Sequence, residues 1–113
     1  MSIFKSIHDF LFGEKHYHME AKEYVKQGVA KIAINDFKGA LHDFTEAIRQ
    51  EPEYAEAYYN RGLIHDYFSD TAAATEDLLV AKELFEKQGD TAHLADIEEK
   101  LRELGNGGHR EGR

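Results

Sequence analysis

Hydrophobic positions in the middle of the chain recur with the period of an α-helix. They fall at steps of three or four residues along one face, beginning at Phe37 and continuing through Ala40, Leu41, Phe44, Ala47 and Ile48. Such a stripe predicts an amphipathic helix. Asn35 and Asp36 precede the stripe as N-cap candidates, and Pro52, the single proline of the chain, follows its end.

The same pattern occurs twice, because residues 21–54 and 55–88 align without gaps over 34 positions each. Phe44 of the first segment is replaced by Leu78 in the second. Each segment carries two helical patterns and no strand signal, so the sequence predicts two helix–turn–helix units. The matching pairs are Tyr24 and Tyr58, Gly28 and Gly62, Asp36 and Asp70, Ala40 and Ala74, and Ala47 and Ala81.

A glycine recurs inside the first helix of each unit, where it costs about 1 kcal/mol relative to alanine. In the second unit it ends the stretch "EAYYNRG", residues 56–62. We interpret Gly62 as a point of close approach, where the partner helix lies against bare backbone. Tyr58, one turn earlier, is expected to fill the wider gap between the helices.

These residues resemble the tetratricopeptide repeat family. The resemblance rests on Tyr24 and Gly28, on Tyr58 and Gly62, and on the series Ala40, Phe44, Ala47 and Pro52. It implies an all-α fold, a right-handed superhelix (solenoid) of antiparallel helix pairs, and the chain looks like small bacterial members that have two repeats and flanking helices. Some positions depart from the family pattern: Gln27 and Arg61 replace Leu, Lys31 and His65 replace Tyr, and Glu86 replaces the closing Pro.

Both flanks keep the register of the repeat. The N-terminal residues 1–20 predict a leading helix, since His8-Asp9-Phe10 lies 34 residues before His42-Asp43-Phe44 and the stripe Ile3, Ile7, Phe10, Leu11 is helical. Residues 89–105 predict a capping helix, with Asp90 as N-cap and Gly105 as C-cap. Its apolar stripe is Leu94, Ile97, Leu101 and Leu104.

The capping helix has Glu98 where a repeat would need glycine, which is typical of a polar end to the array. We expect its outward residues to be Asp96, Glu99, Lys100, Arg102 and Glu103. The predicted organisation is one helical-repeat domain over residues 1–105, with about six helices, and a flexible tail over residues 106–113, which are rich in glycine.

By the same resemblance, the first helices of the units line a concave groove that binds a partner. The implied groove residues are Lys22, Val25, Lys26, Val29, Ile32 and Ala33 from the first unit, and Glu56, Tyr59, Asn60, Leu63, Asp66 and Tyr67 from the second. Tyr59 and Tyr67 could instead line only the seams between helices. A subgroup of the family holds chaperone C-terminal carboxylates with Lys and Asn, but Val25 and Val29 stand at two of those positions, which favours a more apolar ligand.

The N-terminal helix has three interpretations. It can pack on the end of the solenoid, which we favour, or form a homodimer through Ile3, Phe4 and Phe12. It can also attach to a membrane surface, but membrane-surface helices are usually rich in Lys and Arg, and this segment has Lys5 beside Asp9. Membrane association is therefore the weakest of the three.

Composition narrows the function further. A formal net charge of -8 argues against nucleic-acid binding, and the absence of cysteine excludes disulfides and thiolate chemistry and fits a cytoplasmic location. The "HYH" stretch, residues 16–18, lacks an evident third metal ligand, and no catalytic or phosphate-binding motif occurs. We expect a non-catalytic adaptor or scaffold without cofactor or metal that binds a peptide or protein. The alternative is a structural module that self-associates through the N-terminal helix.

Overall fold

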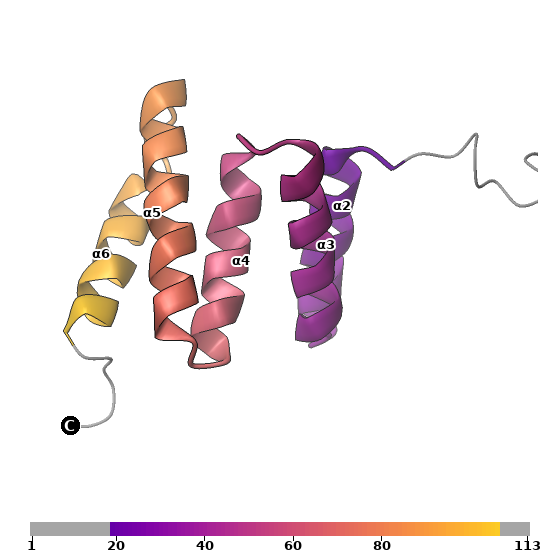
Figure 1. The fold of residues 1–113 in the computed structure, drawn as a ribbon, viewed down its shortest axis with the longest axis horizontal. Coiled ribbons are helices and arrows are strands. Elements are labelled where there is room, and N and C mark those ends of the chain that lie inside the picture. The colour runs from indigo at the N-terminus through magenta and orange to yellow at the C-terminus, as the bar shows by residue number, and fades with distance from the viewer. Residues whose placement is uncertain (1–18, 107–113) are drawn as a thin grey trace, which may run out of the picture.

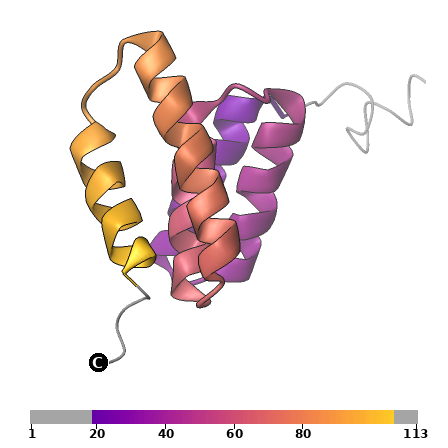
Figure 2. The same ribbon diagram turned by 60° about the vertical axis from the view of Figure 1, so that its left-hand side comes forward.

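The computed structural model describes residues 19–106, which form five α-helices arranged side by side in chain order (Figure 1). The predicted leading helix and the tail after residue 106 lie outside the described residues. Short turns join consecutive helices, so neighbours run antiparallel, and the view in Figure 2 shows the same ladder from a second side. The helices are α2 (Ala21–Ala33), α3 (Phe37–Gln50), α4 (Ala55–Tyr67), α5 (Thr71–Gln88) and α6 (Leu94–Gly105).

The second helix of each unit begins at the aspartate that the repeat alignment pairs. The Asp36 carboxylate accepts a hydrogen bond from the backbone N–H of Gly39 at 3.0 Å, and Asp70 does the same for Ala73 at 3.2 Å. Each aspartate thereby satisfies one amide that the first helical turn leaves without a partner. The prediction of Asp36 as N-cap is confirmed.

The capping helix is shorter than the sequence predicts. It begins at Leu94 with His93 as N-cap, and Gly105 is its last residue rather than its C-cap. The prediction of Asp90 as N-cap is wrong. Gly89, the C-cap of α5, has a left-handed backbone (φ 74°) that turns the chain, and the Asp90 carboxylate accepts a hydrogen bond from the amide of Ala92 within the loop. Residues 89–93 form the loop between α5 and α6.

The core divides into two clusters, and α4 contributes residues to both. The first cluster centres on Phe44 and includes Ala57 and Ile64 of α4, whereas the second centres on Leu78 and Ile97 and ties α6 to α5. At each repeated glycine a side chain of the partner helix lies against the glycine backbone. A Cβ on Gly28 would lie 2.8 Å from the Phe44 ring, and one on Gly62 would lie 3.0 Å from Cγ of Leu78. The close-approach interpretation of Gly62 is confirmed.

Each hairpin also buries one aspartate between its two helices. Asp43 is 2% exposed and lies 3.0 Å from Nζ of Lys31. Asp77 is 4% exposed and receives two hydrogen bonds from Arg61, from Nε at 2.7 Å and from Nη2 at 2.9 Å. Burying a carboxylate is costly unless it is paired and hydrogen-bonded, so these cations complete the helix seams.

Candidate partner-binding groove

An apolar hollow lies between α2 and the start of α4. It encloses about 630 Å³ and is lined by Lys22, Val25, Lys26, Val29 and Ala30 of α2 together with Tyr54 and Glu56. Val25 is 4% exposed and packs into the first core cluster, so it forms the floor, whereas Val29 is 45% exposed and stands open to solvent. Five of the predicted groove residues therefore border one pocket.

Helical spacing explains why these α2 residues share a face. Lys22, Lys26 and Ala30 recur at four-residue steps, as do Val25 and Val29, so they form two adjacent rows along α2. Tyr54 closes the pocket from the other side, immediately before α4 begins. Burial, followed by the nearby carboxylates of Glu56 and Glu51, raises the pKa of the Tyr54 phenol. Tyr54 is therefore neutral at physiological pH and offers a hydroxyl at the pocket wall.

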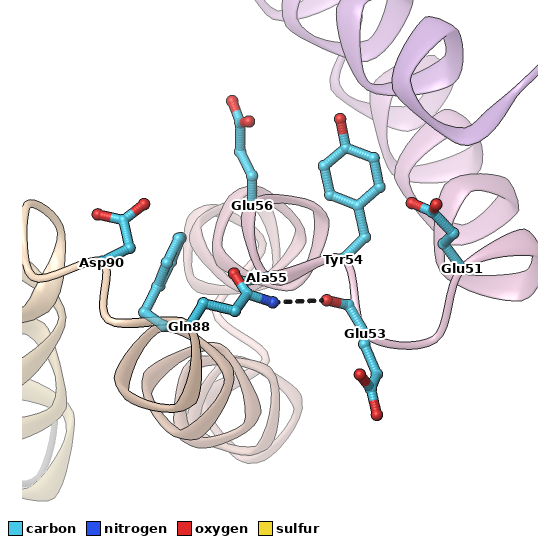
Figure 3. Close-up of a pocket in the computed structure, with 8 residues that line it drawn as sticks. Glu51, Glu53, Tyr54, Ala55, Glu56, Gln88 and Asp90 are labelled. Carbon is cyan, nitrogen blue, oxygen red and sulfur yellow. Dashed lines mark hydrogen bonds between the residues drawn. The ribbon is translucent and has the colours of Figure 1, made fainter.

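A second, acidic pocket adjoins the first and shares Tyr54 and Glu56 with it. It encloses about 300 Å³, and Figure 3 shows its side chains around the start of α4, where Tyr54 and Glu56 point to the same side. The amide of Gln88 donates to the backbone carbonyl of Glu53 at 3.2 Å, which holds the loop before α4 against the end of α5. The carboxylates that line this pocket are Glu51, Glu53, Glu56 and Asp90.

The predicted groove residues in the centre of α4 are partly covered by neighbouring segments. Tyr59 is half-buried, its ring centroid lies 5.2 Å from that of His93, and it packs against the second core cluster. Burial, reinforced by Asp96, raises the pKa of Tyr59. Asn60 and Leu63 are half-buried as well. The phenol of Tyr58 donates to the carbonyl of Pro52 at 2.9 Å, so it also anchors the turn before α4.

At the far end of α4 the predicted groove residues behave differently from one another. Asp66 pairs with Nζ of Lys100 at 3.1 Å, which ties α6 to α4. Burial is the largest single influence and lowers the pKa of Lys100, but the hydrogen bonds and charges of Asp66 and Glu103 together outweigh it and raise that pKa. Lys100 therefore faces α4, so its predicted outward position is wrong. Tyr67 is 63% exposed and lies 4.3 Å from the ring of Phe37, while Ile32 packs against the first core cluster.

Sequence reasoning missed the polar residues of the two hairpin seams. The departures from the family pattern at Gln27, Lys31, Arg61 and His65 all face a buried aspartate. Gln27 donates to Asp43 at 3.3 Å, and Nε2 of His65 lies 3.7 Å from Asp77. A signal existed, because these polar replacements and the two aspartates recur at the same 34-residue offset. Tyr54 and Ala30 of the apolar pocket were also missed.

Other sequence predictions concern features beyond this pocket. The residues proposed for self-association, Ile3, Phe4 and Phe12, lie outside the described residues. Among the helices that the structure describes, none is long and apolar enough to cross a membrane. Over residues 19–106, no group of three or more His, Asp or Glu side chains is placed to hold a metal ion.

Comparison with known proteins agrees with this architecture. A family model described as TPR repeat matches residues 22–65. The chain is 43% identical over 75 residues to the tetratricopeptide repeat protein 36 homolog of Nematostella vectensis, covering 66% of this chain and 41% of that protein. It is 34% identical over 82 residues to tetratricopeptide repeat protein 36 of Danio rerio, covering 73% and 44%. The matches thus span less than half of each relative's length.

Two solved structures share the fold at low sequence identity. The TPR2B domain of yeast Sti1, in its complex with pHsp70, superposes with a TM-score of 0.72 at 19% identity, covering 79% of this chain and 71% of that one. A tetratricopeptide repeat domain protein from Salinibacter ruber gives a TM-score of 0.70 at 16% identity, covering 83% and 95%. The 34-residue repeat, the helix ladder and these matches agree. The chain belongs to the tetratricopeptide repeat family.

Proposed function

We propose that this chain is a non-catalytic adaptor that binds a peptide segment or partner protein in the groove lined by α2 and the start of α4. The observation that carries the proposal is the apolar pocket at this position, with Val29 left 45% exposed above a buried Val25. Val29 is in contact with water in the unbound protein. Covering this apolar side chain with a partner removes that contact, and this favours binding.

The fold gives independent support to a protein or peptide partner. The tetratricopeptide architecture is that of a protein–protein interaction module, and the similar Sti1 domain was solved in a complex with pHsp70. Nothing in the groove over residues 19–106 resembles a catalytic constellation, because its ionisable groups are surface lysines, carboxylates and tyrosines with no activated nucleophile. The proposal therefore assigns binding and no chemistry.

A pair of matched aspartate substitutions tests the groove. Val29→Asp places a charge in the apolar pocket, whereas Leu79→Asp places the same charge on α5, where Leu79 is 53% exposed and lines neither pocket. Both residues are exposed, so both variants should fold and keep their melting temperatures within a few degrees. In affinity capture, we expect a partner that wild type and Leu79→Asp retain and that Val29→Asp loses.

Two results would contradict the groove assignment. The first is capture of the same partner by wild type and Val29→Asp at equal yield. The second is recovery of the chain itself as its own partner, with light scattering showing a dimer, which would favour the self-association alternative. In that case Phe4→Asp should return the protein to a monomer.

A further inference from the structure

Positive and negative side chains lie on different sides of the apolar pocket, and their positions indicate which kind of ligand can bind there. Two lysines lie on the α2 side, and a cluster of carboxylates lies on the side of the α4–α5 junction. We propose that the pocket takes an internal peptide segment with one large apolar side chain and with carboxylates on one flank only, the flank that lies over α2. This inference rests on the proposed function of the groove.

The apolar side chain is required by the floor of the pocket. Val25, Val29 and Ala30 offer only methyl groups, and the ring of Tyr54 closes the opposite wall. A polar ligand side chain placed against Val25, Val29 and Ala30 would lose its hydrogen bonds to water without finding replacements on those three side chains. A leucine-sized or aromatic side chain would instead bury its surface against Val29 and Tyr54.

The α2 flank favours carboxylates. Lys22 and Lys26 are both exposed and lie one helical turn apart on the same face, so two acidic residues of a ligand can reach them together. The molecule as a whole repels such a ligand, because the chain carries a formal net charge of -8. An acidic segment is therefore attracted to the two lysines of α2 more than to the acidic surface around them.

The opposite flank excludes carboxylates. On the side of Tyr54 a ligand meets Glu56, which lines both pockets, and then the other acids of the adjoining pocket, Glu51, Glu53 and Asp90 (Figure 3). Lys87 lies 3.4 Å from Glu53 and offsets only one of them. An acidic residue on this flank would face like charges, which weakens binding. The favoured ligand is consequently acidic on one side of its apolar residue and neutral or basic on the other.

Four synthetic peptides test this asymmetry with the full 113-residue chain. All are acetylated and amidated, so that no terminal carboxylate contributes, and all carry a central Leu in a Gly/Ser background. One has no acid, one has two Glu before the Leu, one has two Glu after it, and one has two Glu on each side. Binding is followed by NMR titration, with the backbone amides of Val25, Val29 and Ala30 as reporters.

We expect one of the two single-flank peptides to bind tightest, by about three- to tenfold over the neutral peptide, since two exposed ion pairs each contribute modestly. The peptide with two Glu on each side of the Leu should bind more weakly than the better single-flank peptide. Whether the Glu residues of that better peptide precede or follow the Leu gives the direction in which the peptide chain lies across the pocket. The inference is overturned if the neutral peptide binds equally well, if the doubly flanked peptide binds tightest, or if no peptide shifts the reporter amides.

Charge-removing variants assign the effect to the named residues. In the Lys22→Gln/Lys26→Gln variant, the affinity of the tightest-binding peptide should fall to that of the neutral peptide. Lys38→Gln, at an exposed lysine on α3, should leave this affinity unchanged. Glu56→Gln should increase the affinity of the peptide that has two Glu on each side of the Leu. Equal losses in the α2 and α3 variants would overturn the assignment. If Val29→Asp loses its partner but no charge preference appears, the adaptor function stands and this inference alone fails.

Discussion

The hairpins α2–α3 and α4–α5 each bury one aspartate on the seam between their helices, yet they neutralise it differently. Asp43 is paired with the flexible ammonium of Lys31 and the neutral amide of Gln27. Asp77 receives both nitrogens of the Arg61 fork, with distances of 2.7 and 2.9 Å, while His65 lies nearby. A bidentate guanidinium is held in one geometry, whereas an ammonium on a long stem can move back into water.

This difference shows how one repeat can diverge from its neighbour without changing the fold. Arg61 also donates to Thr45 of α3 at 3.2 Å, so the ion pair of the second hairpin extends across the boundary between units. The hydrogen bond to Asp77 raises the pKa of Arg61 despite the opposing effect of burial, which favours the charged guanidinium. The second hairpin should therefore depend on its buried acid more strongly than the first.

The largest expected effect is from removing the two buried acids one at a time. Asp77→Ala leaves Arg61, whose side chain is 21% exposed, without its carboxylate and should destabilise the fold by about 2–3 kcal/mol. Asp43→Ala should cost only about 1–2 kcal/mol, because Lys31 is 31% exposed and can reach solvent. Denaturant unfolding of the two variants measures this difference directly.

Replacing both partners sharpens the comparison. Arg61→Met/Asp77→Leu removes both charges and replaces the carboxylate by an apolar side chain with the same branching, so it should recover most of the stability that Asp77→Ala loses. Equal losses for Asp43→Ala and Asp77→Ala would show that the geometry of the cation does not matter. A double variant as unstable as Asp77→Ala would show that the seam needs the ion pair itself.

A smaller effect is expected from filling the two glycine contacts with a methyl group. At Gly28 the new Cβ meets the Phe44 ring at 2.8 Å, and that ring is fully buried, so it has no space to move into. Gly28→Ala should therefore cost about 1–2 kcal/mol through overpacking. At Gly62 the nearest atom is Cγ of Leu78 at 3.0 Å, which needs a smaller shift, and the helix propensity gained by alanine offsets part of the strain.

Thermal melting of Gly28→Ala, Gly62→Ala and Gly62→Leu orders these contacts. The leucine variant should lose about 1–3 kcal/mol, because its branched end has no free volume between α4 and α5. A melting temperature of Gly62→Leu equal to that of wild type would be incompatible with close approach at this glycine. A greater loss for Gly62→Ala than for Gly28→Ala would reverse the expected order.

The sequence was sufficient to predict the helix ladder because its signals are local and repeated. Helical stripes, paired glycines and the capping Asp36 each depend on a few neighbouring residues, and the 34-residue offset repeats them. The start of α6 could not be read in this way. Asp90 follows Gly89 as an N-cap often follows a turn, and only the docking of Ile97 and Leu104 into the second cluster fixes where the helix begins.

The groove was less predictable than the fold, since its surface depends on which residues neighbouring helices cover. The family pattern placed Val29 and Tyr59 in equivalent roles, but Val29 is exposed while Tyr59 packs beside His93. The reason is that His93, just before α6, packs against Tyr59 of α4, whereas the described residues place no helix on the matching side of α2. Tyr54 entered the pocket from a loop, where helical periodicity carries no information.

The smallest expected effect comes from the turns inside the two hairpins, which share a left-handed residue of different type. Asn35 and Ser69 both have φ of 65°, a conformation that asparagine tolerates better than serine. Ser69→Asn should therefore stabilise the fold by about 0.5 kcal/mol, and Asn35→Ser should destabilise it by a similar amount. Both side chains are exposed, so packing contributes little to either change. Because the two substitutions exchange the same residues between equivalent turns, chemical denaturation of the pair isolates backbone strain from every other difference between the hairpins. Two shifts of the same sign would show that strain at this position does not distinguish the units.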